Sequence, residues 1–228
     1  MDDLTDKQIQ RLGQFLTTEH FTLQGLRNGT ISEANGRLGH YLSAVGSGIV
    51  ALAFVADVSE IGMAFLAFSA VIFPSLIVLG LATLVRLLQI GVTDSRCVQA
   101  INRIRHFYVD AGPETLRYLS FPHYDDPAAV QRTMNPFHAP GVLQGLATTP
   151  GPVILINSVL AGTFGSVLAV GLFSLRVLPT VLVGVAVLVI AFVVHVQIAS
   201  RIWPRETREH VEVRFPTPED RETESTRE

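Results

Sequence analysis

Four long apolar segments are the feature that most constrains how this chain can fold. They occupy residues 38–56, 61–85, 152–173 and 177–200. Charge is almost absent from these parts of the sequence, because residues 38–85 contain only Asp57 and Glu60 and residues 133–200 contain only Arg176. A bilayer core of about 30 Å needs about 20 residues of helix. Each segment is close to that length, so the sequence predicts four transmembrane helices.

A soluble fold is the alternative for such apolar segments, and the composition argues against it. Charged residues make up 16% of the 228 residues, and the mean hydropathy is +0.38. An average soluble domain is about 25% charged. Helices buried inside a soluble protein can be apolar on every side, but here too few amphipathic helices would be left to cover four of them. We therefore assign the fold class as an all-α membrane protein.

Two of the connections between the apolar segments are short, at residues 57–60 and 174–176. Because unpaired backbone is not tolerated in lipid, each short connection predicts an antiparallel transmembrane hairpin. The predicted parts are a cytoplasmic N-terminal helix, hairpin 1, a cytoplasmic helical segment that continues from the second span, hairpin 2, and a charged, largely disordered tail. They occupy residues 1–37, 38–90, 91–151, 152–200 and 201–228, in that order.

The placement of basic residues predicts how the helices are oriented in the membrane. Of the 17 Lys and Arg residues, 16 lie before residue 38, between residues 86 and 151 or after residue 200, and only Arg176 lies in a short connection. The positive-inside rule therefore predicts a multi-pass protein of the plasma (inner) membrane with both termini and residues 91–151 in the cytoplasm. The net charge is −3 without a basic stripe, which argues against a nucleic-acid partner. Membrane lipids are the expected partners.

The polar middle segment contains helix signals of its own. An apolar stripe that includes Val98, Ile101 and Ile104 predicts that the second span continues as one helix to Asp110, where a Gly-Pro pair stops it. Further along, Asp126 followed by proline is typical of the N-cap of a short helix.

Two polar residues stand out within the second pair of apolar segments. Asn157 and His195 each lie 19 residues from Arg176, so an antiparallel hairpin brings them to a similar depth. Polar groups inside a membrane usually face the protein interior. We favour one interhelical hydrogen bond, worth about 0.6 kcal/mol, over the alternative of an ion or proton site.

A polar cluster flanks the first predicted hairpin at the membrane boundary. The register of the hairpin brings Arg86 opposite Glu33, and the long Arg86 side chain can reach the interface. This candidate interfacial cluster consists of Glu33, Asn35, Arg37 and Arg86. It predicts either an ion pair that locks the two helices together or separately solvated interfacial charges.

A basic group on the helix that follows the second span is a candidate cytoplasmic binding face. It consists of Arg103, Arg105 and His106 in the sequence INRIRHFY. Such a face suits a lipid headgroup, a nucleotide or a partner protein, and the alternative is a solvated basic surface. No group of residues has a spacing typical of a metal site, and we expect neither a metal nor a cofactor.

Small residues at four-residue spacing indicate helix faces on which two backbones can approach closely. They are Ser43, Ser47, Gly48, Ser158, Gly162 and Ser166. Such faces can pack within one chain or between copies, and their presence in two different spans favours a homo-oligomer.

Several blocks of the sequence are distinctive. They are TLQGLRNGTISEANGRLGHYLSAVGSGIVALAFV within residues 15–55, RLLQ at 86–89, INRIRHFY at 101–108 and INSVLAG at 156–162. In these blocks the chain resembles a family of uncharacterised four-span integral membrane proteins from actinobacteria. The resemblance implies a four-span fold in a bacterial inner membrane and implies no established activity. A looser similarity, in architecture only, is to the two-span effector modules of bacterial defence systems.

Three functions stay open at the level of sequence. The chain lacks G-x-S-x-G, Walker, paired-cysteine and His–Glu zinc motifs, so we expect no enzyme. The favoured function is a non-enzymatic oligomeric membrane module, a scaffold or sensor, with a cytoplasmic helical interaction surface. One alternative is an ion channel or membrane-permeabilising effector with Asn157 and His195 near the pathway. The other is a membrane-surface enzyme that uses the interfacial cluster and the cytoplasmic binding face.

Overall fold

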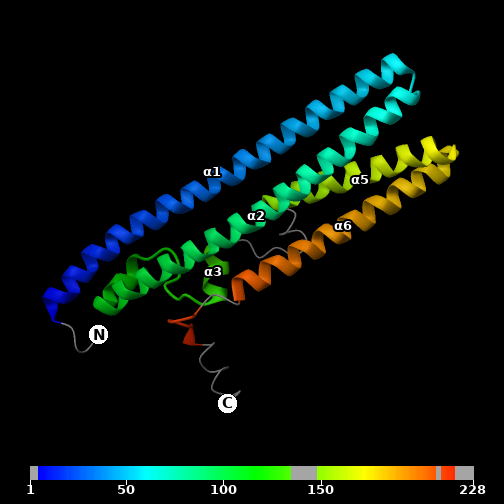
Figure 1. Cartoon of the computed structure of the whole chain (residues 1–228). Helices are drawn as coiled ribbons and strands as arrows, with labels where there is room; N and C mark the ends of the chain where they lie inside the picture. The colour runs from blue at the N-terminus through cyan, green and yellow to red at the C-terminus, as the bar shows by residue number, and fades with distance from the viewer. Residues whose placement is uncertain (1–4, 135–147, 209–211, 219–228) are drawn as a thin grey trace. The chain divides into compact units, whose positions relative to one another are not determined.

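The computed structural model describes residues 5–134, 148–208 and 212–218. These residues form helices and loops without a β-strand (Figure 1), which confirms the predicted all-α class. In chain order the elements are α1 (Asp6–Ser59), α2 (Met63–Ala111), the 3-10 helix η1 (Pro113–Tyr118), α3 (Pro127–Met134), α5 (Pro150–Phe173) and α6 (Val177–Arg208).

Four of these helices, α1, α2, α5 and α6, are long and apolar enough to cross a bilayer. This confirms the four apolar helices predicted from the sequence and is the architecture expected of a multi-pass membrane protein. Helix α2 has 49 residues and ends at Ala111, which confirms that it continues past its apolar segment to Asp110. Helix α6 continues beyond Ser200, its predicted end, to Arg208.

The predicted N-terminal helix and the first apolar segment form one helix, α1, of 54 residues. The Gln8 side chain marks its start, because its Oε1 atom accepts hydrogen bonds from the Thr5 backbone N–H at 2.9 Å and from the Thr5 hydroxyl at 2.8 Å. Gly25 and Gly29 each lower helix stability by about 1 kcal/mol relative to alanine. No proline interrupts residues 6–59, so the helix continues through these glycines.

The chain forms two compact units, and α1, α2 and α6 contribute residues to both. Unit 1 comprises Met1–Ser32, Ile90–Ala139 and Glu206–Glu228, and unit 2 comprises Glu33–Gln89 and Pro140–Arg205.

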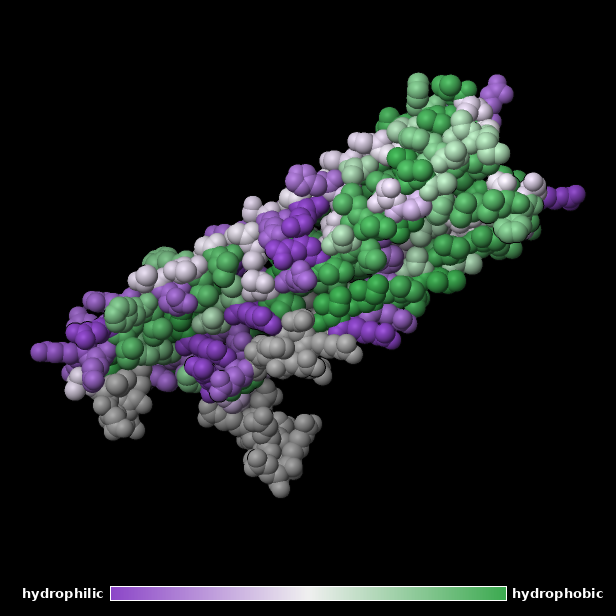
Figure 2. Space-filling model, viewed as in Figure 1, coloured by the Kyte–Doolittle hydropathy of each residue, from purple (hydrophilic) through white to green (hydrophobic). Residues whose placement is uncertain are grey.

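Unit 2 is apolar on the outside and polar in part of its interior. Within it α1 lies beside α2, and α5 lies beside α6 (Figure 1). Leu182, Val185 and Ile190 of α6 are exposed, and Figure 2 shows hydrophobic side chains over the surface of these helices. Asn157 and His195, in contrast, are buried. This distribution suits a lipid environment, where intramembrane polar groups face the protein interior.

Unit 1 is built around the predicted apolar stripe of α2. Its buried side chains include Val98, Ile101, Ile104, Ala129 and Val130, which confirms the stripe and adds the buried face of α3. Helices α1 and α2 are also joined by an ion pair, in which Arg27 Nε is 2.8 Å from Asp94 Oδ1. The start of α3 is capped as predicted, because Asp126 Oδ1 accepts the backbone N–H of Ala129 at 2.9 Å.

Candidate functional site

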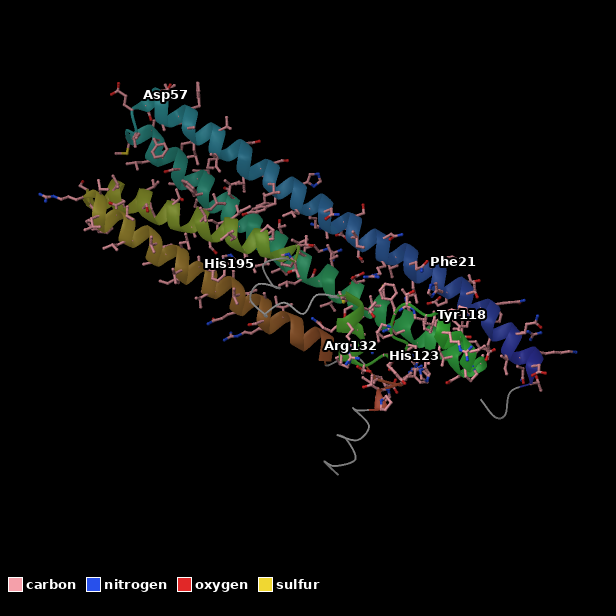
Figure 3. The ribbon with its side chains drawn as sticks, turned by 180° about the vertical axis from the view of Figure 1, so that it is seen from behind. Phe21, Asp57, Tyr118, His123, Arg132 and His195 are labelled. Atoms are coloured by element: carbon pink, nitrogen blue, oxygen red, sulfur yellow. The ribbon has the colours of Figure 1, made fainter. Side chains whose placement is uncertain are left out.

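Asn157 and His195, paired by counting along the sequence, are direct neighbours in unit 2. Asn157 lies on α5 and His195 on α6, and Asn157 Nδ2 is 2.9 Å from His195 Nε2. Both side chains are buried, and Figure 3 labels His195 among the helices of this unit.

The Asn157 amide also reaches the other two long helices of unit 2. Its Oδ1 accepts a hydrogen bond from the Tyr41 hydroxyl of α1 at 3.3 Å, and its Nδ2 donates to the Ile77 carbonyl of α2 at 3.2 Å. A Cβ atom at Gly80 would lie 2.4 Å from Asn157 Oδ1, so a glycine leaves the space that the amide occupies. One amide therefore joins α1, α2, α5 and α6. We call Tyr41, Gly80, Asn157 and His195 the four-helix polar cluster.

The geometry of this cluster indicates a neutral His195 ring. His195 Nδ1 is 2.5 Å from the Ala191 carbonyl oxygen, and because a carbonyl oxygen only accepts, Nδ1 carries the hydrogen. His195 Nε2 then accepts an N–H of Asn157. Both ring nitrogens and both polar atoms of the amide are engaged. Such a closed network is better suited to holding helices in one arrangement than to binding a ligand.

The interfacial cluster contains a two-point ion pair between α1 and α2. Arg86 Nε is 2.9 Å from Glu33 Oε1, and Arg86 Nη2 is 3.1 Å from Glu33 Oε2. Arg37 also donates from Nε to Glu33 Oε1, at 2.9 Å. All three side chains are more than one-third exposed, so solvent screens the pair, and its planar geometry aligns the helices more than it stabilises them. Asn35 is exposed and, among the described residues, makes no hydrogen bond to this cluster.

The three residues of the predicted binding face do not act together in unit 1. Arg105 Nη1 donates to Asn102 Oδ1 on its own helix at 2.8 Å and to the Pro122 carbonyl, in the loop after η1, at 3.4 Å. Arg103 and His106 instead contact a segment from the C-terminal part of the chain.

That segment differs from the expectation of a largely disordered tail. Helix α6 continues to Arg208, and residues 212–218, which we call the tail segment, make hydrogen bonds to the loop and helix residues of unit 1 at Asp125 and Asp126. Residues 209–211 and 219–228 of the predicted tail lie outside the described residues. The contact depends on main-chain N–H groups. Nearly every residue has such a group, so the amino-acid composition does not predict the contact.

Two buried aspartates receive the tail segment. The backbone N–H of Arg214 donates to both carboxylate oxygens of Asp125 at 3.1 Å, and the N–H of Phe215 donates to Asp125 Oδ1 at 2.7 Å. The N–H of Thr217 donates to Asp126 Oδ2 at 3.1 Å. In return, the backbone N–H of Asp125 donates to the Phe215 carbonyl at 3.1 Å. The segment is thus recognised through its main chain.

Polar side chains of α2 hold these aspartates in place. Arg103 Nε donates to Asp125 Oδ2 at 2.6 Å. Gln99 donates to the Asp125 carbonyl and Asn102 donates to the carbonyl of the preceding residue, both at 2.9 Å. The receiving site is therefore anchored to a helix. We call Arg103, Asp125 and Asp126 the acidic clamp.

A stack of rings completes the contact with the tail segment. The Phe215 ring lies 4.1 Å from the His106 ring between centroids, with 25° between their planes. His123, labelled in Figure 3, stacks on His106 at 5.5 Å. Arg103 Nη2 also donates to the Glu212 carbonyl. One aromatic side chain and five main-chain groups of the segment are thus engaged.

The electrostatics of the clamp suit a row of N–H donors. Burial opposes the charge on Asp125, but the Arg103 guanidinium and the N–H groups of Arg214 and Phe215 outweigh it and hold the pKa of the carboxyl below its ordinary value. The ionised carboxylate only accepts hydrogen bonds. Burial, together with the nearby His106, lowers the pKa of His123, which favours an uncharged ring in the stack.

Part of the predicted small-residue set packs α5 against α6 in unit 2. A Cβ atom at Gly162 would lie 2.7 Å from the Gly184 carbonyl oxygen, and one at Gly184 would lie 2.1 Å from Ser166 Oγ. Ser158 is buried and donates to the Ile154 carbonyl one turn earlier on its own helix. The α5 residues therefore allow a close helix–helix approach.

The small residues of α1 divide between two faces. A Cβ atom at Gly48 would lie 2.9 Å from the Leu76 Cδ1 atom of α2, so Gly48 packs within the chain. Ser43 and Ser47 are exposed and leave a small-residue face of α1 open.

Sequence reasoning missed Tyr41, Gly80 and Asp125. The signal at Gly80 is one glycine among several in apolar helices, and Asp125 is one acidic residue beside a recognised N-cap, so neither position is distinctive. Across the described parts of the chain, no three His, Cys, Asp or Glu residues gather in a way that could hold a metal ion.

No protein-family model, curated protein or solved structure matches the chain. The resemblance to the actinobacterial four-span family stays a prediction.

Proposed function

We propose that this protein is a non-enzymatic, oligomeric membrane module, a scaffold or sensor, whose unit 1 binds peptide segments of proteins. The observation that carries the proposal is the acidic clamp, which holds the tail segment through the N–H groups of Arg214, Phe215 and Thr217. Recognition of main-chain groups plus a pocket or stack for one side chain is a common mode of peptide binding. The carboxylates of the clamp are occupied by hydrogen bonds, which favours a binding role over acid–base catalysis.

The proposed membrane arrangement has two antiparallel transmembrane hairpins, α1–α2 and α5–α6, with unit 1 and both termini in the cytoplasm. The location of 16 of the 17 basic residues outside the short connections supports this orientation. Cysteine labelling tests it with Gln131, an exposed residue of α3, changed to Cys in a Cys97→Ser background. A membrane-impermeant reagent should label Gln131→Cys only after lysis. Labelling in intact cells would overturn the orientation.

The open small-residue face of α1 supports the oligomeric part of the proposal. Exposed Ser43 and Ser47 permit another helix to approach closely. Native mass spectrometry should give multiples of the 24.8 kDa chain mass, and Ser47→Leu should reduce the oligomeric fraction. A monomer at all protein concentrations would remove oligomerisation from the proposal.

Peptide titration tests the binding function. The full-length chain carrying Phe215→Ala, which removes the tail ring from the stack, is placed in nanodiscs and titrated with a fluorescent peptide of sequence EVRFPTP. We expect saturable binding, with a scrambled peptide as the control. Asp126→Asn should weaken binding, because the new amide keeps the α3 cap but replaces the acceptor for the threonine N–H with a donor. Absence of binding to both wild type and Phe215→Ala would refute the function.

A further inference from the structure

The tail segment reaches the acidic clamp with a defined pattern of donors. Arg214, Phe215 and Thr217 each provide an N–H, and the residue that is skipped is Pro216, which has none. Another residue at this position would add an N–H that needs its own partner. Proline also restricts its own φ and disfavours a helical conformation of the preceding residue. Less conformational entropy is therefore lost when the segment binds.

The side chains of the segment contribute unequally to the contact. Phe215 stacks on His106 at 4.1 Å between ring centroids. Arg214 is exposed, and its guanidinium lies 3.3 Å from a carboxylate oxygen of Glu212, within the same segment. The site therefore places no requirement on the side chain at position 214, whereas it favours an aromatic ring at position 215.

The acidic clamp is less stable without a bound segment than with one. Asp125 is fully buried, and among the described residues its Oδ1 atom accepts hydrogen bonds only from Arg214 and Phe215 of the tail segment. Withdrawal of the segment would remove these donors from the carboxylate, at a cost in hydrogen bonding. Exchange for another peptide with the same donors avoids that cost. The site therefore favours replacement of its occupant over simple opening.

We propose that the acidic clamp is a receptor for peptides in which an aromatic residue precedes proline, and that the tail segment is the built-in competitor that keeps the clamp closed. The inference rests on the proposed function, because it names the ligand class and the regulation of the same site.

Peptide variants test the ligand class on the full-length Phe215→Ala protein in nanodiscs. N-methylation of the phenylalanine amide in EVRFPTP removes the shorter of the two hydrogen bonds to Asp125 Oδ1 and should weaken binding about tenfold. N-methylation of the second residue, which corresponds to Val213, is the matched control, because that amide makes no bond to the clamp, and it should change binding less than about twofold.

Two further peptides test the aromatic–proline pair. Replacement of the phenylalanine by leucine should weaken binding about fivefold through loss of the ring stack, and replacement by tyrosine should not. Replacement of the first proline by alanine should weaken binding about fivefold through the added N–H and the lost rigidity. If the leucine or alanine peptide binds as well as the parent, the ligand class is wrong. The proposed function survives that result, since it requires only that the parent peptide bind.

Substitutions in the tail test the competition. A segment tethered by a short linker has an effective concentration on the order of millimolar, so wild type should bind the parent peptide about tenfold more weakly than Phe215→Ala does. Arg214→Ala is the matched control, because it removes an exposed side chain and keeps the N–H, and it should bind as wild type does. Hydrogen exchange provides a second measurement, in which excess peptide should remove the protection of the wild-type tail segment. Equal peptide affinity for wild type and Phe215→Ala, or protection that peptide does not alter, would overturn the competition.

Discussion

Substitution of Asn157 by leucine should destabilise unit 2 more than substitution of either partner side chain. The amide makes hydrogen bonds to Tyr41, Ile77 and His195. At about 0.6 kcal/mol for each interhelical bond in a membrane, their loss removes about 2 kcal/mol. Leucine also leaves the Tyr41 hydroxyl and His195 Nε2 unpaired in the interior, at about 1–3 kcal/mol each when no other partner is found. We expect a total loss of about 4–8 kcal/mol.

The partner substitutions should give smaller losses in a fixed order. Tyr41→Phe removes one long hydrogen bond of 3.3 Å and should cost about 0.5–1 kcal/mol. His195→Ala removes one hydrogen bond and the packing of the ring, and should cost about 2 kcal/mol. The double variant Asn157→Leu/His195→Leu should be more stable than the sum of its single variants predicts, by about 1 kcal/mol, because no unpaired ring nitrogen remains.

Equilibrium unfolding measures these values. The protein in detergent micelles is titrated with sodium dodecyl sulfate, and helix content is followed by circular dichroism. Leu155→Val is the control, because Leu155 lies on α5 but is exposed, and its effect should stay within about 0.5 kcal/mol. A loss below about 1 kcal/mol for Asn157→Leu, or a loss for Tyr41→Phe as large as that for Asn157→Leu, would refute the role of the amide as the common partner of four helices.

Gly29→Ala should raise the free energy of unfolding by about 1 kcal/mol, because alanine is the better helix former and no atom lies within 4 Å of the added Cβ. Gly162→Ala should lower it by about 1–3 kcal/mol through overpacking, because its Cβ would meet the Gly184 carbonyl oxygen at 2.7 Å; shifts of the same sign in one detergent titration would contradict this pair. Acid should release the tail segment. The pKa of Asp125 is lowered in the folded protein, so its stabilising contribution is complete above the ordinary value of about 4 and is lost as the pH falls through the lowered pKa. Hydrogen-exchange protection factors for residues 212–218 should fall between pH 7 and pH 2, and protection that persists at pH 2 would contradict the role assigned to this carboxylate.

Sequence alone determined the helical architecture, because the signals for it act locally along the chain. Apolar length identified α1, α2, α5 and α6, and a proline after Asp126 identified the start of α3. Counting from the short connections also paired Asn157 with His195, since an antiparallel hairpin converts equal sequence separation into equal depth. Periodicity alone likewise identified the buried stripe of α2 in unit 1.

Only the tertiary structure decided which groups surround these residues. Tyr41 and Gly80 lie on helices whose rotation about their axes depends on packing, so their contacts with Asn157 cannot be read from spacing. The contact of Asp125 with the tail segment joins residues 89 and 90 positions apart through main-chain N–H groups. Nearly every residue carries such a donor. The donors that reach a buried carboxylate are therefore selected by the fold and not by residue type.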